Sequence, residues 1–265
     1  MLTTLLRLLS RNNASRPASL IQDPDEGGDL ITRIRRRKLT YLSERKLASI
    51  VETCRDIERE GLDGTFIEAG CALGGSTILI GMTKGLYRPL QVYDLFGMNL
   101  PMAVEDLLDG TASTAPPDRL RAMGALSSEH FDVGDDLLAQ VSANLLAFGI
   151  DPERESVAFV RGLLQDTLRP VGPIAFVHVD VDRYQPVKVC LDRVFPRLVV
   201  GGSIILDDYH DWGGCRRATD EFLRTVVGEF DVDDSAGSLK ITRCAAARDA
   251  FGGRNEPVRQ RLALA

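Results

Sequence analysis

Residues 65–77 of the chain read TFIEAGCALGGST, an apolar run that leads into a glycine-rich turn. The run Thr65-Phe66-Ile67 is typical of a short buried strand, and a helix is predicted from about Ser76 to Lys84. Glycines between a strand and a helix permit a tight turn and a close approach of another group to the backbone. The free N–H groups at the start of the helix favour a small anionic ligand. The stretch therefore predicts a ligand-binding turn in an α/β fold.

The rest of the chain continues this alternation of predicted strands and helices. Further strands are expected at 90–93, 157–159, 174–179, 202–206, 230–232 and 238–242, and further helices at 136–148, 185–194 and 214–226. Strands that alternate with helices of about ten residues imply a mostly parallel sheet covered on both faces. The last two strands fit a closing antiparallel hairpin. We therefore predict an α/β protein with a doubly wound, mostly parallel, seven-stranded sheet.

The length of 265 residues fits one large domain with additions. Residues 1–38, which include the basic run 33–38, are expected to form an N-terminal helical arm. Residues 97–134 contain prolines and lack a clear period, which is typical of a lid or substrate-binding insertion. The catalytic domain is expected at 39–245, followed by a C-terminal tail at 246–265.

The composition limits the classes of partner. Hydrophobic residues make up 44% and charged residues 26%, as in globular proteins, and the net charge of −6 disfavours nucleic acid and acidic lipid. The N-terminus lacks a long apolar stretch, so no stable membrane insertion is expected. The five cysteines are scattered and form no CxxC pair, which indicates reduced thiols. These features predict a cytoplasmic enzyme.

Two acidic residues are predicted at the ends of neighbouring strands. Glu68 directly precedes the first glycine of the turn, and Asp94 follows the second strand. A dinucleotide site needs the pattern G-x-G-x-x-G, and Ala72 stands where the second glycine is required. Glu68 suits the cationic amine of S-adenosylmethionine, and Asp94 can accept hydrogen bonds from both ribose hydroxyls. The pair favours S-adenosylmethionine over NAD.

Four more carboxylates are predicted at the same edge of the sheet. Asp180 and Asp182 follow one buried strand and can project the same way, and Asp207 and Asp208 follow another. Clustered carboxylates repel one another unless a cation lies between them, and hard oxygen ligands suit Mg²⁺ or another hard divalent cation. The sequence therefore predicts a metal site.

A bound metal would lower the pKa of an acceptor hydroxyl, but deprotonation still needs a base. Asp182 is the first candidate for this base, because it follows Asp180 by two residues and so lies one pleat further past the end of the strand. His210 is the alternative and could line the acceptor pocket. His178, inside an apolar strand, is expected to be a core histidine.

Taken together, these segments resemble the macrocin O-methyltransferase family of metal-dependent sugar and antibiotic-tailoring methyltransferases. The matching segments, in the family's order, are 40–45, 66–70, 93–97, 160–162, 166–168, 180–184 and 201–209. The resemblance implies a class I, Rossmann-like fold that uses S-adenosylmethionine, and a homo-oligomer. The chain departs from the family's usual pattern at Val181, Gln185 and 98–101, around the acceptor pocket.

The resemblance also implies a set of site residues. The methionine part of the cofactor would lie against Glu68, Gly70 and Ser76, the ribose against Asp94, and the adenine against residues 162–166. The residues expected to bind the cofactor are Thr40, Glu68, Gly70, Ser76, Asp94, Gly162, Gln165, Asp166 and Asp180. Mg²⁺ would be bound by Asp180, Asp207 and Asp208, with Asp182 as the general base. His210 is the second candidate catalytic residue, on the argument from the residues given above.

The acceptor stays open between two classes of hydroxyl. A sugar, whether free, in an oligosaccharide or on a glycosylated natural product, competes with a catechol-type small phenol. The low aromatic content, 6%, and the acid-rich mouth of the site favour the sugar. An NAD-dependent or nucleotide-sugar enzyme is the more distant alternative, disfavoured by Ala72 and by the aspartate cluster. A catalytically silent protein of the same fold would have lost one of the acids, and none is lost.

Overall fold

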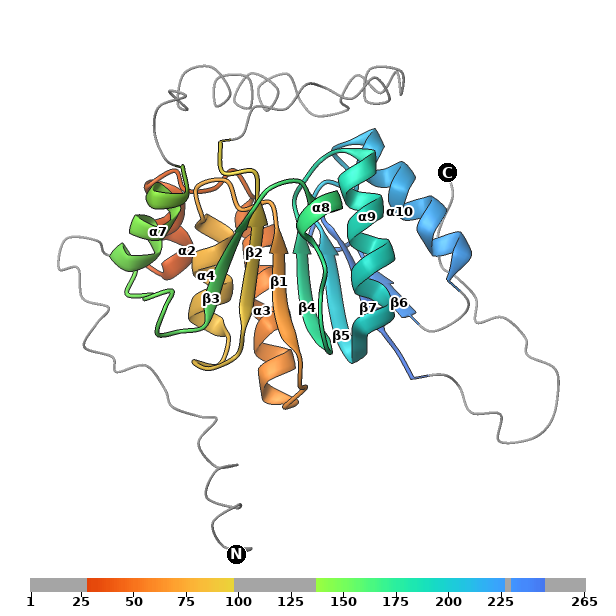
Figure 1. Cartoon of the computed structure of the whole chain (residues 1–265), viewed down its shortest axis with the longest axis horizontal. Coiled ribbons are helices and arrows are strands. Elements are labelled where there is room, and N and C mark those ends of the chain that lie inside the picture. Colours follow the sequence, from red (N-terminus) through yellow and green to blue (C-terminus); the bar gives the residue numbers. More distant parts are fainter. Residues whose placement is uncertain (1–27, 98–136, 227–229, 246–265) are drawn as a thin grey trace, which may run out of the picture.

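A seven-stranded sheet forms the centre of the molecule (Figure 1). The computed structural model describes residues 28–97, 137–226 and 230–245. Residues 1–27 of the predicted N-terminal arm, most of the predicted lid insertion and the whole predicted C-terminal tail lie outside the described residues. The strands are β1 (Thr65–Ala69), β2 (Leu90–Asp94), β3 (Val157–Arg161), β4 (Ile174–Val179), β5 (Leu198–Leu206), β6 (Phe230–Asp233) and β7 (Leu239–Arg243). Their order is β3-β2-β1-β4-β5-β7-β6. Strands β1 to β5 are parallel, and β7 runs antiparallel to both of its neighbours, β5 and β6. The doubly wound sheet predicted from the sequence is confirmed.

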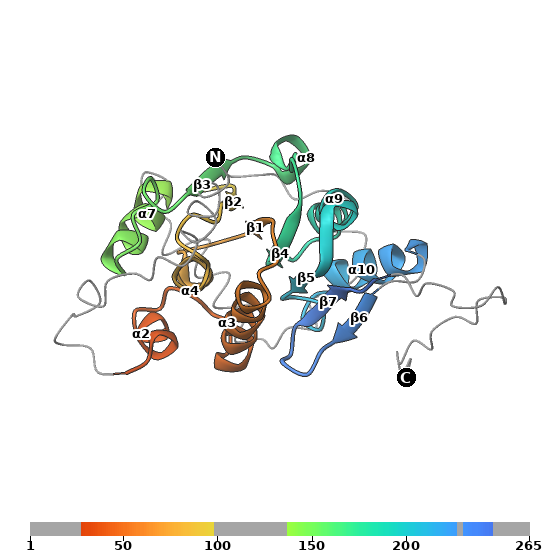
Figure 2. The same ribbon diagram turned by 90° about the horizontal axis from the view of Figure 1, so that it is seen from below.

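Helices cover both faces of this sheet, because its strands alternate apolar side chains between two cores. Phe66 of β1 belongs to a core with α2 (Leu30–Arg36), α3 (Glu44–Arg59), α4 (Gly75–Thr83) and α7 (Leu137–Ala147). Ile67 belongs to the opposite core, with α8 (Leu164–Thr167), α9 (Tyr184–Val194), the 3₁₀ turn η2 (Phe195–Arg197) and α10 (Gly213–Thr225). Figure 2 shows α3 and α9 on opposite sides of the sheet. None of the helices in the described part of the chain is long and apolar enough to cross a membrane.

The structure extends the fifth strand beyond the sequence prediction. The strand begins at Leu198, because an irregularity in its pairing with β4 absorbs Gly201, which has a φ of 83°. The sequence prediction began this strand at Gly202. Neither α8 nor η2 was predicted, because each is shorter than the repeat that helical periodicity needs.

The carboxyl ends of β1, β4 and β5 place the predicted site residues next to one another. The hydrogen-bond ladder continues one residue past the strands, since the Asp180 N–H donates to the Ala69 carbonyl at 2.8 Å and the Asp207 N–H to the Val179 carbonyl at 2.9 Å. The strand order reverses at β1, which has β2 on one side and β4 on the other. Ligands of open α/β sheets bind at this kind of position.

Gly70 is required where β1 approaches the end of β4. Its φ is 85°, and a Cβ at this position would lie 2.0 Å from the Asp180 carbonyl oxygen. We predict that Gly70→Ala lowers the free energy of unfolding by at least about 2 kcal/mol, because it adds a clash with backbone to left-handed strain. Gly61→Ala is the matched control, since Gly61 has a φ of 65° and no atom within 4 Å of an added Cβ.

Urea unfolding of both variants measures the difference. Gly61→Ala should cost about 1 kcal/mol, the left-handed strain alone. Equal losses in the two variants would contradict the close approach at Gly70.

Candidate active site

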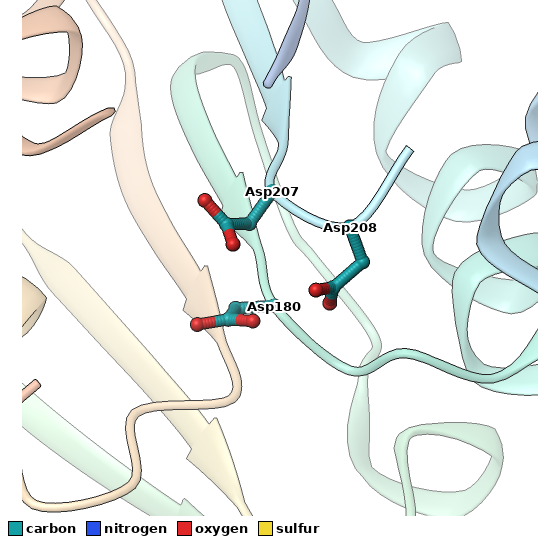
Figure 3. A group of neighbouring side chains, drawn as sticks. All are labelled: Asp180, Asp207 and Asp208. Atoms are coloured by element: carbon teal, nitrogen blue, oxygen red, sulfur yellow. The ribbon is translucent and has the colours of Figure 1, made fainter. Parts of the chain in front are cut away.

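Three carboxyl groups converge at the ends of β4 and β5. One oxygen from each of Asp180, Asp207 and Asp208 lies within 4.8 Å of the others, and Figure 3 shows the three groups turned toward a common space. Asp207 and Asp208 are buried, and Asp180 is partly exposed. Burial and the charge of Asp207 raise the pKa of Asp180 to about 7. Burial and the three neighbouring aspartates raise the pKa of Asp208 well above its usual range.

This donor set fits a hard divalent cation. Its ligands are oxygens only, they come from two rigid strand ends, and their raised pKa values show that negative charge is costly at this point. A cation would remove that cost by holding the carboxylates ionised.

Asp182 lies beside the cluster in a strained conformation. Its φ is 57°, in the left-handed region that few residues other than glycine adopt, and its N–H donates to Asp208 Oδ2 at 3.2 Å. Strain of this kind persists where the surrounding structure fixes it, which is common at functional sites. The structure thus brings the predicted base next to the predicted metal ligands.

The two histidines have different surroundings. His210 is one-third exposed, with Nε2 3.4 Å from Asp234 Oδ2 and Nδ1 3.3 Å from an Arg216 nitrogen, so it packs toward the β6–β7 turn. His178 is fully buried, as expected of a core histidine, and its Nδ1 lies 3.1 Å from Glu68 Oε1. Burial alone would lower the pKa of His178, but the hydrogen bond and charge of Glu68 raise it above the usual value.

Glu68 is fully buried beneath the glycine-rich turn. Its Oε2 accepts a hydrogen bond from the Thr77 hydroxyl at 2.5 Å, and its Oε1 lies beside His178. Neither oxygen is accessible, so Glu68 joins the start of α4 to β4 in this structure. Binding of the cofactor amine by Glu68 stays a prediction, and the burial does not favour it.

Asp94 shapes the turn on which the cofactor is expected to lie. Its Oδ2 accepts from the N–H groups of Cys71 at 2.7 Å and Ala72 at 3.3 Å, and its Oδ1 accepts from Phe96 at 2.8 Å. Ala72 has a φ of 46°. Asp94 therefore holds a left-handed alanine where a dinucleotide turn would have glycine. Three backbone donors use three of its four lone pairs, and the fourth, on Oδ1, is left for a ribose hydroxyl.

The other predicted cofactor residues lie along the same edge of the sheet. The Gly75 N–H donates to the Leu39 carbonyl at 3.1 Å, which brings Thr40 against the start of α4, where Ser76 is 3% exposed. The Gly162 N–H donates to the Asp94 carbonyl at 3.0 Å. Gln165 and Asp166 follow in α8, and Asp166 is exposed to solvent.

Lys46 of α3 is a site residue that sequence reasoning missed. It is 7% exposed, and its ammonium group forms ion pairs with Asp207 and Asp211. The sequence contains a pattern that could have shown this burial. Helical spacing places Lys46 on the same side of α3 as the buried residues Ile50, Thr53 and Ile57. Such a lysine is normally assigned to the solvated face.

The strand order and the glycine-rich turn after β1 are those of the class I methyltransferase fold, which a solved O-methyltransferase structure shares. The profile of the macrocin O-methyltransferase family (TylF) matches residues 24–230. The chain therefore belongs to this family of O-methyltransferases, and the resemblance noted in the sequence is confirmed.

Individual relatives show the same similarity. The chain is 28% identical over 204 residues to the demethyldecarbamoylnovobiocin O-methyltransferase of Streptomyces niveus, covering 74% of this chain and 70% of that protein. It is 28% identical over 209 residues, 77% of this chain and 73% of the relative, to the 8-demethyl-8-(2,3-dimethoxy-alpha-L-rhamnosyl)-tetracenomycin-C 4'-O-methyltransferase of Streptomyces olivaceus. The solved structure of the O-methyltransferase NovP superposes with a TM-score of 0.59 at 24% identity, covering 78% of this chain and 83% of that one.

Proposed function

We propose that this enzyme transfers the methyl group of S-adenosylmethionine to a hydroxyl of a sugar, either free, in an oligosaccharide or on a glycosylated natural product. The observation that carries the proposal is the cluster of Asp180, Asp207 and Asp208 beside Asp182 in a chain of this family. One relative is named for methylation of a rhamnosyl-bearing tetracenomycin, which supports a sugar acceptor. A small phenol is the second candidate, and no contact in the described site favours it.

The cluster would hold Mg²⁺ or another hard divalent cation. When bound, the cation supplies positive charge that lowers the pKa of a nearby hydroxyl. Asp182 would take the hydroxyl proton. S-adenosylmethionine would supply the methyl group: the acceptor oxygen would bond to the methyl carbon as the carbon–sulfur bond breaks, which leaves S-adenosylhomocysteine. His210 is proposed to line the acceptor pocket.

The cofactor is proposed to lie across the carboxyl ends of β1, β2 and β3. Asp94 would bind the ribose while it holds the turn at Ala72, Gly70 and Ser76 would lie against the methionine part, and residues 162–166 would flank the adenine. A homo-oligomeric assembly and a cytoplasmic location are further proposals, which rest on the family and on the composition.

The test is isothermal titration with S-adenosylhomocysteine, with and without Mg²⁺ and with NAD as the comparison ligand. Micromolar binding of S-adenosylhomocysteine and none of NAD is expected. Asp94→Ala should weaken the binding by about 1–3 kcal/mol, because charged hydrogen bonds to the ribose and to the turn are lost.

Asp151→Ala is the matched control for this loss. Asp151 also accepts backbone N–H bonds in a turn, at 3.1 Å from Glu153 and 3.4 Å from Arg154, but it lies in the segment before β3. Unchanged affinity in Asp94→Ala would refute the ribose assignment, and a preference for NAD would refute the function.

A further inference from the structure

Lys46 joins the start of α3 to the turn that carries two of the proposed metal ligands. Its Nζ donates to the Asp207 carbonyl oxygen at 2.9 Å, to Asp207 Oδ2 at 3.0 Å and to Asp211 Oδ2 at 2.9 Å. An ammonium group has three donors, and these three bonds use all of them. Lys46 therefore has no donor left for a substrate.

The turn from Asp207 to Trp212 is closed on itself. The N–H groups of Asp211 and Trp212 both donate to the Asp208 carbonyl oxygen, at 3.1 and 2.8 Å. Lys46 connects Asp207 and Asp211, so Asp208 lies between the two residues that Lys46 fixes. The first turn of the helix that carries Lys46 is fixed by its cap, because the Ser43 hydroxyl accepts from the Lys46 N–H at 3.3 Å.

We propose that Lys46 is a positioning residue for metal binding, which fixes the direction of the Asp207 carboxylate and the turn that carries Asp208 before the cation enters. The inference rests on the proposed function, because it assumes that the aspartate cluster is a metal site. With one Asp207 oxygen held by Lys46, the other oxygen is directed by the same contact. Without this contact, the Asp207 carboxylate and the turn that carries Asp208 would lose conformational freedom when the cation binds, and Lys46 orders both before binding.

A different role for Lys46 would have the opposite effect on metal affinity. If Lys46 only offset the negative charge of the cluster, its ammonium would repel the incoming cation, and a neutral residue would make Mg²⁺ bind more tightly. If Lys46 positions the ligands, a neutral residue makes Mg²⁺ bind more weakly. The sign of the change in affinity separates the two roles.

The experiment titrates the full-length protein with Mg²⁺ alone, by calorimetry, in the wild type and in Lys46→Met. We expect Lys46→Met to bind Mg²⁺ about 10–100-fold more weakly, as found when groups that orient metal ligands are removed. Lys84→Met is the matched control, because Lys84 is also buried, at 4% exposure, but donates to the carbonyl oxygens of Gly85, Leu86 and Glu155. Its Mg²⁺ affinity should equal that of the wild type. Circular dichroism measures the folded fraction of each variant.

Lys46→Arg decides the matter if Lys46→Met does not fold. A guanidinium keeps the charge but cannot place one nitrogen among three acceptors, so Mg²⁺ should bind at least about threefold more weakly than in the wild type. Equal or tighter Mg²⁺ binding in either Lys46 variant would overturn the inference. A wild type that binds no Mg²⁺ would instead remove the metal from the proposed function, and the inference with it.

Discussion

Replacement of Asp182 by asparagine is expected to lower kcat by about 10²–10⁴-fold, the contribution of a positioned general base. The amide has the size of the carboxyl group but cannot take a proton from the acceptor. Asparagine also tolerates the left-handed backbone that Asp182 adopts, with a φ of 57°, better than most residues do. The loss should therefore reflect chemistry and not a rearranged turn.

Binding measurements separate this outcome from a damaged site. The affinities of Asp182→Asn for S-adenosylhomocysteine and for Mg²⁺ should stay close to those of the wild type. Asp192→Asn, which removes an exposed carboxylate that pairs with Lys188 at 2.7 Å on α9, should keep full turnover. Full turnover in Asp182→Asn with the metal bound would assign the base to another residue, and His210 would be tested next.

The fold could be predicted because its signals are local and repeated. Each apolar run bounded by glycine, proline or an acid became a strand, and β4 begins and ends at the predicted residues, Ile174 and Val179. The misplaced start of β5 shows the limit. Gly201 and Gly202 interrupt the run of apolar residues, which predicts the end of a strand. In the sheet, β5 continues past both glycines because residues on either side of them pair with β4.

The site could be predicted to the level of strand ends, but not to the level of contacts. The convergence of Asp180 with Asp207 and Asp208 follows from parallel strands that end at one edge. The burial of Glu68 depends on Thr77 and on His178, which is 110 residues away in sequence. Lys46 and Asp207 are 161 residues apart. No pattern within one segment shows pairings of this range.

Asp208→Asn is expected to have opposite effects on metal binding and on the stability of the metal-free protein. Loss of a ligand should weaken Mg²⁺ binding by at least about 100-fold, and methyl transfer should fall with it. The asparagine carbonyl oxygen can still accept from the Asp182 N–H, as Asp208 Oδ2 does at 3.2 Å. The variant therefore keeps the backbone of the site while it loses a charge.

The same change should stabilise the metal-free fold. Burial and the neighbouring aspartates raise the pKa of Asp208, and a carboxyl with a raised pKa destabilises the folded state at every pH above its unfolded value of about 4. Urea unfolding in EDTA at pH 8 should therefore show a higher free energy of unfolding for Asp208→Asn than for the wild type.

Addition of saturating Mg²⁺ should reverse the order of stability. The bound cation stabilises the folded wild type by RT ln(1 + [Mg²⁺]/Kd), and Asp208→Asn gains little because its Kd is larger. A metal-free variant less stable than the wild type would mean that Asp208 supports the fold by its charge. In a cation site, the carboxylates are expected to repel one another until the cation binds. The absence of such repulsion would therefore mean that the cluster is a structural network of hydrogen bonds and ion pairs.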